Sequence, residues 1–193
     1  MQPGATHSAT CLRIRCERLI DSPSEQELIR RAKAGDKLAY EELLEPNLKP
    51  AARLARVLLG DPGEAEDAVQ EAAVRAWRRL GNLRVGSNFQ PWFLGIVVRQ
   101  ARTIQRGSWW SVIRLPSLPS PTAPTNLPWL EGEDLRRAVS GLSAGQREAV
   151  AMHFYLDMRI EDVAASLSLS VAGVKSRINR ALKELRISLG EGF

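Results

Sequence analysis

The fold is decided by residues 160–185, IEDVAASLSLSVAGVKSRINRALKEL. The apolar spacing of the first part predicts a short helix with one buried side: Ile160, Val163, Ala164 and Leu167. Ser168-Leu169-Ser170 forms a three-residue turn, and Ser170 caps a longer helix. A short helix, a tight turn and a longer final helix are typical of a helix-turn-helix, whose last helix lies in the major groove of DNA.

The final helix has one apolar side and one basic side. At 100° per residue, Val174, Ile178 and Leu185 face inward. The other side and its flanks carry Ala172, Lys175, Ser176, Arg177, Asn179, Arg180 and Lys183. Such groups suit phosphates and base edges, although a charged face that meets only solvent is the alternative. Capping, turn and face together favour DNA binding.

Composition divides the rest of the chain into distinct segments. Residues 24–106 show helical periodicity without period-two alternation, and residues 133–189 resume it, with a capping box at Ser143-Ala144-Gly145-Gln146. Residues 107–132 contain five prolines among serines and threonines and predict an extended linker. Residues 1–23 predict a flexible leader. The sequence therefore predicts an all-α protein with two small helical domains joined by an extended linker.

The middle of the first domain has clear helix signals. Pro46 and Pro50 interrupt one apolar pattern, where we expect a kink or a break. Asp61-Pro62-Gly63-Glu64 starts the next helix, with Asp61 as N-cap. One face of that helix carries Asp67, Gln70, Glu71, Val74 and Arg78. A solvated surface is the plain interpretation of this face, but an apolar Val74 framed by polar groups is typical of a protein-docking patch.

The last helix of the first domain begins near Phe89, after a loop from Gly81 to Asn88. One stripe carries Trp92, Arg99, Arg102 and Arg106, with Trp109 and Trp110 just beyond. Arginines that follow a backbone and aromatic rings that stack on unpaired bases suit single-stranded DNA. The alternative is an amphipathic helix whose tryptophans belong to the core.

Charge and composition limit the class of protein. A net charge of +5 and a pI of about 9.7 favour a polyanionic partner. No apolar run spans a bilayer and no signal peptide is evident, which predicts a cytoplasmic protein without membrane insertion. His7, Cys11 and Cys16 lack a nearby fourth ligand for a closed zinc site, so a flexible leader is expected before a redox or metal role.

An enzyme is not expected. His7 and His153 are the only histidines, and the sequence has no glycine-rich phosphate loop. We therefore expect no cofactor and no catalytic residues.

Three segments resemble a known family. Residues 60–77 resemble region 2 of the extracytoplasmic-function sigma factors, which direct bacterial RNA polymerase to promoters, and residues 88–106, NFQPWFLGIVVRQARTIQR, look like the next part of that region. Residues 142–186, with GQREAV, EDVA and VKSRINRAL, resemble region 4. The similarity covers roughly residues 24–189, apart from the linker.

The resemblance implies a role for each surface. Asp67, Gln70, Glu71, Val74 and Arg78 would bind the clamp helices of the polymerase's largest subunit. Asn88, Trp92, Arg99, Arg102 and Arg106 would bind the −10 promoter element, with a flipped base held by the 83–92 segment. Ser170, Ala172, Lys175, Ser176, Arg177, Asn179, Arg180 and Lys183 would bind the −35 element. Promoter DNA, core polymerase with its clamp helices and flap, and an anti-sigma factor are the implied partners.

The sequence departs from the family pattern at several positions. Arg99 and Thr103 stand where Asn and Asp are common, so the −10 preference is expected to differ. Ser168 replaces a turn glycine, at a cost on the order of 1 kcal/mol if the residue is left-handed. Arg159 replaces a Ser or Thr cap, with Asp157 as the possible substitute, and Ala172-Gly173 replaces a frequent Gly-Thr pair. The alternative function is a two-domain helix-turn-helix regulator that is not a polymerase subunit.

Overall fold

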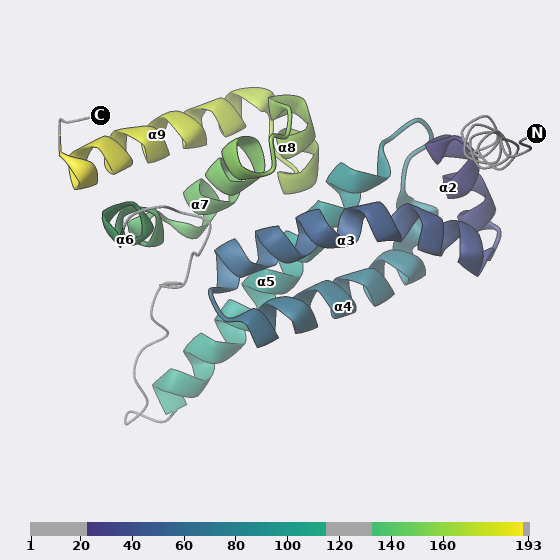
Figure 1. Ribbon diagram of the computed structural model, residues 1–193, viewed down its shortest axis with the longest axis horizontal. Coiled ribbons are helices and arrows are strands. Elements are labelled where there is room, and N and C mark those ends of the chain that lie inside the picture. Colours follow the sequence, from purple (N-terminus) through teal and green to yellow (C-terminus); the bar gives the residue numbers. More distant parts are fainter. Residues whose placement is uncertain (1–22, 115–132, 191–193) are drawn as a thin grey trace, which may run out of the picture.

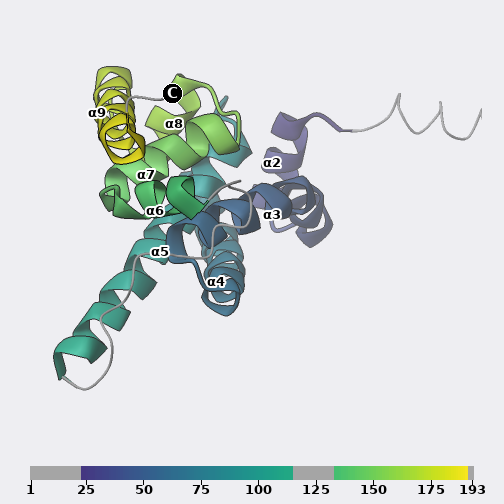
Figure 2. The ribbon, with the colours of Figure 1, turned by 60° about the vertical axis from the view of Figure 1, so that its left-hand side comes forward.

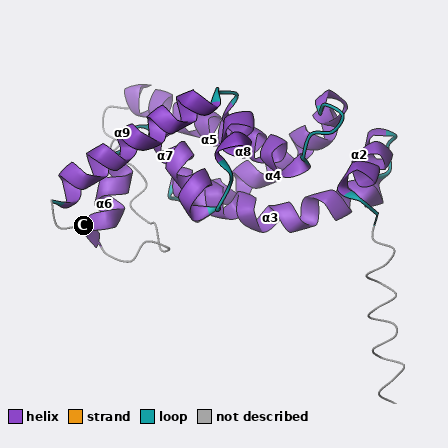
Figure 3. Ribbon diagram, turned by 90° about the horizontal axis from the view of Figure 1, so that it is seen from above, coloured by secondary structure: helices purple, strands orange, loops and turns teal. Residues whose placement is uncertain are grey.

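The computed structural model describes residues 23–114 and 133–190, and every regular element in them is helical (Figures 1 and 3). The elements are α2 (Glu25–Lys33), α3 (Lys37–Leu59), α4 (Pro62–Arg79), the short 3₁₀ helix η1 (Leu80–Asn82), α5 (Phe89–Arg114), α6 (Glu133–Gly141), α7 (Ala144–Val150), the single π-turn η2 (Ala151–Tyr155), α8 (Ile160–Leu167) and α9 (Val171–Leu189). The predicted all-α fold with a helix-turn-helix is confirmed.

Side-chain caps begin several of these helices. The Asp61 carboxylate accepts from the backbone N–H of Glu64 at 2.8 Å, and Pro62 follows as the first helical residue. Ser170 accepts from the N–H of Gly173 at 3.1 Å, and the capping box at Ser143 is formed. Each cap satisfies a backbone donor that a helix start would leave unpaired. The predicted starts of α4, α7 and α9 are therefore confirmed.

Pro46 and Pro50 predicted a kink or a break in α3; a break is wrong, because the helix runs from Lys37 to Leu59 through both prolines. Proline has no backbone N–H, so the carbonyl oxygen four residues earlier has no helical hydrogen-bond partner. Pro46 is exposed and Pro50 is half-buried, so water can reach this side of the helix. Leu43 and Leu54, on the two sides of the prolines, are both buried in the core. Tertiary packing before and after the prolines keeps the helix continuous.

The first helical unit is built from α2 to α5, with α3, α4 and α5 packed against one another. Its core contains an aromatic cluster. The rings of Phe89 and Phe93 stack with centroids 5.6 Å apart, and Tyr40 lies 5.0 Å from Trp77. Aromatic pairs at such distances add to the stability from burial alone. This cluster fixes the start of α5, where the predicted −10 surface begins.

Helix α5 continues to Arg114, past the predicted domain boundary at Arg106. Gly107 does not end the helix, and the first proline after it is Pro116. The last turns of α5 project away from the other helices (Figure 2). The remainder of the predicted linker, residues 115–132, and almost all of the predicted leader lie outside the described residues.

The two helical units are in direct contact, whereas the sequence predicted two small domains joined only by an extended linker. Helix α8 of the second unit packs against α5 of the first (Figures 1 and 3). Buried apolar residues of both units, such as Phe93 and Val163, belong to one continuous cluster. The chain therefore forms a single packed body from two helical units.

Candidate nucleic-acid and partner interfaces

The outward face of α9 is the most clearly defined of the candidate surfaces. Val174, Ile178 and Ala181 are buried on its inner side. The outer side forms a shallow depression lined by Ala172, Lys175, Ser176, Asn179, Arg180 and Lys183, all of them exposed. These residues were predicted to face outward, and the structure confirms this orientation. The surface offers three cations and an amide within one stretch of helix, which suits a DNA groove.

Two residues predicted for this surface also have structural roles. Ser170 caps α9 through Gly173, and Arg177 is half-buried. A Cβ atom on Gly145 would lie 2.7 Å from the Nη1 atom of Arg177, so this guanidinium packs tightly on the first turn of α7. The glycine at position 145 leaves the space that the arginine occupies. Arg177 therefore lies against α7 as well as flanking the outward face.

A buried arginine, which the sequence did not single out, supports the second unit from within. Arg147 donates to the carbonyl oxygens of Val139, Ser140 and Leu142 at 3.3, 2.7 and 3.0 Å. Burial lowers the pKa of Arg147, and the charge of Glu148 acts in the opposite direction. Cationic donors at a helix C-terminus satisfy carbonyls that have no helical partner. Arg147 thus joins the end of α6 to α7.

The tight turn before α9 is strained. Ser168 has φ of +56°, in the left-handed region, and its N–H donates to the carbonyl oxygen of Ala165. The predicted strain at the serine that replaces a glycine is therefore present. At the start of α8, Arg159 is the N-cap residue without a side-chain capping bond.

On α4, the five residues of the predicted docking face share one side of the helix. Asp67, Gln70, Val74 and Arg78 are exposed, and Glu71 is half-exposed. Val74 is 44% exposed, although four smaller apolar residues of the same helix, all alanines, are buried. Glu71 forms an ion pair with Arg75 at 2.6 Å. An accessible valine between charged and amide groups is the arrangement expected of a protein-docking patch.

The predicted −10 surface on α5 is divided. Asn88, Arg99 and Arg106 are exposed, whereas Trp92 and Arg102 are half-buried. The Trp92 ring packs 5.8 Å from that of Phe89. The side chains of Trp109 and Trp110 lie outside the described residues.

Arg102 does not point freely into solvent. Its Nε donates to Oε1 of Glu148 at 2.6 Å, and its Nη2 donates to the other carboxylate oxygen. This hydrogen bonding raises the pKa of Arg102 above its ordinary value. The Glu148 side chain is 2% exposed, so the acid is buried between the two units. A residue predicted to bind DNA is thus held by the second helical unit.

Helix α2 holds the loop that precedes α5. Gln26 donates to the carbonyl oxygen of Ser87 at 3.1 Å, and Lys33 donates to that of Leu83. The Glu25 carboxylate accepts from the backbone N–H of Phe89 at 2.6 Å. These three residues fix both ends of the loop, a role that the sequence did not reveal because the partners are more than 49 residues apart.

A cavity of about 610 Å³ separates this loop from α8. Its first-unit wall includes Asn88, Pro91 and Trp92, and its second-unit wall includes Asp162 and Ser168. The segment expected to hold a flipped base therefore faces a space that α8 closes on one side.

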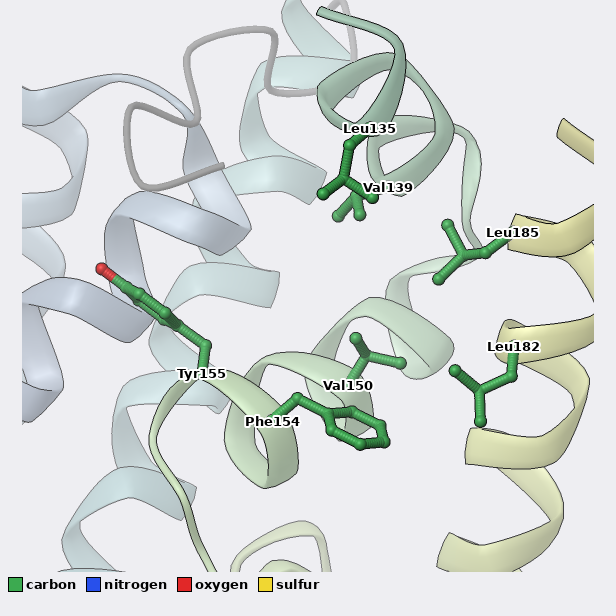
Figure 4. Close-up of a pocket in the computed structure, with 7 residues that line it drawn as sticks. All are labelled: Leu135, Val139, Val150, Phe154, Tyr155, Leu182 and Leu185. Carbon is green, nitrogen blue, oxygen red and sulfur yellow. The ribbon is translucent and has the colours of Figure 1, made fainter. Parts of the chain in front are cut away.

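An apolar groove of about 340 Å³ lies between α6, α7 and α9 (Figure 4). It is lined by Leu135, Val139, Val150, Phe154, Tyr155, Leu182 and Leu185. Phe154 is 56% exposed at its rim, and Tyr155 is covered by the Arg53 guanidinium, 4.2 Å from the ring centroid. A groove with an apolar lining can receive apolar side chains of a partner.

The described part of the chain contains no group of side chains arranged to hold a metal ion, and none of its helices is long and apolar enough to cross a membrane. His7, Cys11 and Cys16 lie outside the described residues.

The geometry defines a helical protein of two units, with a helix-turn-helix whose last helix has an exposed cationic face and, on α4, a separate face with an accessible valine. The models of sigma-70 region 2 and sigma-70 region 4 match residues 43–111 and 132–185. The chain belongs to the extracytoplasmic-function group of RNA polymerase sigma factors. Family membership does not favour the alternative of a regulator separate from polymerase.

Three similar proteins illustrate the relationship. The ECF RNA polymerase sigma factor EcfG of Rhodopseudomonas palustris is 32% identical over 138 residues, which cover 66% of this chain and 72% of the relative. The probable RNA polymerase sigma factor RfaY of Xanthomonas campestris pv. campestris is 29% identical over 84% of this chain, which spans 43% of that protein. The sigma factor RpoE of Bartonella quintana, solved in complex with the anti-sigma factor NepR, is 26% identical in sequence to this chain. The structural match has a TM-score of 0.66 and covers 78% of this chain and 96% of RpoE.

Proposed function

We propose that this sigma factor binds core RNA polymerase through α4 and promoter DNA through α5 and α9, acts in the cytoplasm, and has no enzymatic activity of its own. The observation that carries this proposal is the division of its exposed surfaces. The docking face with the accessible Val74 lies on α4, and a continuous cationic face lies on α9. Separate surfaces allow polymerase and DNA to be bound at the same time.

The −35 element is the proposed ligand of α9. Arg180 and Asn179 are exposed on its outward side, where arginine can bind guanine through two hydrogen bonds and asparagine can bind adenine. Lys175 and Lys183 flank them and suit phosphates. This face has no acidic residue among those lining it.

The −10 element is the proposed ligand of the loop before α5 and of the exposed side of that helix. Asn88, Trp92, Arg99, Arg102 and Arg106 are the proposed contacts. Because α2 fixes the loop through Gln26 and Lys33, the base-binding segment is largely preformed. Preformed sites lose less conformational entropy on binding.

Core polymerase is the proposed partner of Asp67, Gln70, Glu71, Val74 and Arg78, through its clamp helices. We assign the polymerase flap to the apolar groove of the second unit. Leu182 and Leu185 line that groove from α9, while Arg180 and Lys183 face the opposite depression. A flap helix could therefore occupy the groove while α9 contacts DNA. By analogy with the RpoE–NepR complex, an anti-sigma factor is a further proposed partner.

The test is a core-binding assay with the double variant Gln70→Ala, Val74→Asp. A carboxylate at position 74 would have to be desolvated against the polymerase without a partner, which costs several kcal/mol. We expect capture of core enzyme to fall by at least about 100-fold, since each 1.4 kcal/mol is tenfold.

The matched control is Ile187→Asp, which places the same charge at an exposed apolar position of α9 outside the proposed contacts. Its core binding should equal that of the wild type. Unchanged capture by the double variant, with both proteins folded by circular dichroism, would contradict the assignment of the α4 face.

A further inference from the structure

The first turn of α7 meets two charged side chains of α9, and the two helices pack side by side (Figure 1). The Glu184 carboxylate accepts from Nε2 of Gln146 at 2.6 Å. Two helical turns earlier in α9, the Arg177 guanidinium lies over Gly145, the neighbour of Gln146. The acid of this side of α9 therefore has a partner in α7, whereas the base meets a residue without a side chain.

Gly145 leaves the space that the Arg177 guanidinium fills. A Cβ atom at position 145 would lie 2.7 Å from Nη1, 3.2 Å from Cζ and 3.8 Å from Nε, and all three atoms belong to Arg177. The backbone of Gly145 is not in the left-handed region, so its conformation does not require a glycine. Alanine would also favour the helix. Among the described residues, the demand for glycine at this position comes from Arg177.

The Arg177 guanidinium lacks a polar partner. Arg75 and Arg102 are half-buried like Arg177, and each pairs with a glutamate. Within the described residues, Arg177 forms neither a hydrogen bond nor an ion pair. A guanidinium has five N–H donors, and its partial burial without a partner costs free energy. An anion that reaches Arg177 would offset this cost.

Arg177 lies at the border of the cationic face of α9. Helix geometry places it one turn before Arg180 and roughly 60° around the helix axis. It does not line the central depression, which Arg180 and Asn179 share. When a recognition helix enters the major groove, its central face meets base edges and its flanks lie near the sugar-phosphate backbone. The position of Arg177 therefore suits a phosphate better than a base.

We propose that Arg177 binds a backbone phosphate at the edge of the −35 element, and that Gly145 is the positioning residue that holds its guanidinium there. The inference rests on the proposed function for the placement of α9 on DNA. Gly145 acts through Arg177 and does not contact DNA itself. Because every sequence has the same phosphates, this contact adds affinity for duplex DNA in general and leaves the choice of base to Arg180 and Asn179.

The variant Arg177→Met tests the phosphate contact, because it keeps an apolar stem and removes the charge. Binding of the full chain to a 40-base-pair duplex of mixed sequence is followed by fluorescence anisotropy over a range of NaCl concentrations. One phosphate contact fewer should lower the slope of log affinity against log salt by about 0.9, and the affinity at 0.1 M NaCl by about eightfold. The urea midpoint should not fall, since no hydrogen bond is lost.

The variant Gly145→Ala tests the positioning role. Its Cβ atom has to displace the Arg177 guanidinium, so the affinity should fall by part of the same factor, about two- to fivefold. In the Arg177→Met background, the same substitution should change nothing, as a double-mutant cycle will report. Gly141→Ala is the matched control, because a Cβ at the end of α6 meets nothing within 4 Å. Its affinity should equal that of the wild type.

Lys183→Ala, on the outward face of α9, separates failure of this inference from failure of the proposed function. A lower salt slope in Lys183→Ala but not in Arg177→Met would overturn the phosphate contact and leave α9 as the DNA-binding helix. An unchanged slope in both variants would overturn the contact together with the proposed role of α9. If Gly145→Ala weakens binding equally in the wild-type and Arg177→Met backgrounds, the glycine acts through α7 itself and the positioning role is wrong.

Discussion

Replacement of Arg147 by methionine tests whether the buried guanidinium holds the second unit together. Methionine keeps an unbranched apolar stem of similar length but has no donor. Arg147 is 7% exposed and donates to the last carbonyls of α6 and to Leu142 in the following turn. The bonds to Val139 and Leu142 are buried, whereas the bond to Ser140 is partly accessible.

The magnitude follows from those two buried carbonyls. A buried polar group that loses its partner costs about 1–3 kcal/mol. The combined cost of the two unpaired carbonyls is offset in part, because methionine carries no charge that must be desolvated on folding. We expect the free energy of unfolding to fall by about 2–4 kcal/mol.

Urea unfolding followed by circular dichroism measures this change. With a slope of about 2 kcal/mol per molar, the midpoint should fall by about 1–2 M. The control is Arg186→Met on the exposed side of α9, which should stay within about 0.5 kcal/mol of the wild type. A loss below about 1 kcal/mol for Arg147→Met would refute the assigned role of this residue.

Three shorter predictions follow from other sites. Arg180→Ala should weaken binding to promoter DNA by about 5- to 100-fold in an electrophoretic shift assay and leave core binding intact, whereas the control Arg186→Ala should change neither DNA binding nor core binding. Ser168→Gly should raise the free energy of unfolding by about 0.5–1 kcal/mol, because φ of +56° strains a serine; an unchanged urea midpoint would contradict this. Burial raises the pKa of Tyr40, whose hydroxyl donates to the carbonyl oxygen of Ala73, to about 12. An unfolded tyrosine ionises near pH 10, so the neutral Tyr40 hydroxyl contributes fully to the free energy of unfolding below about pH 10, and this contribution declines toward pH 12. The stability advantage of the wild type over Tyr40→Phe should shrink in that range. A constant difference would argue against the raised pKa.

The sequence was most informative where a local rule determines the structure. Asp61 and Ser170 were predicted as caps because a short polar side chain before a helical pattern has one geometry open to it, and both form the expected bonds. The outward face of α9 followed from helix geometry alone. In α3, by contrast, the prolines at 46 and 50 predicted a kink or a break, and the packing of buried leucines on either side keeps the helix unbroken.

Contacts between distant residues could not be predicted in this way. Glu148 and Arg102 are 46 residues apart, and nothing near either position indicates the other. Gly95 shows no turn signal, because the reason for a glycine there is the backbone of Ser166 in another unit. The same holds for Gln26, whose partner is in the loop before α5. Three-dimensional packing therefore decides which part of the predicted −10 surface is accessible.

The most direct measurement is transcription of sheared genomic DNA by purified core polymerase with and without this protein, followed by sequencing of the 5′ ends of the transcripts. We expect new 5′ ends that depend on the protein and share two upstream sequence elements at a fixed spacing, because α5 and α9 would each contact one of them. The same 5′ ends from core enzyme alone, or new ends without shared upstream elements, would contradict the account.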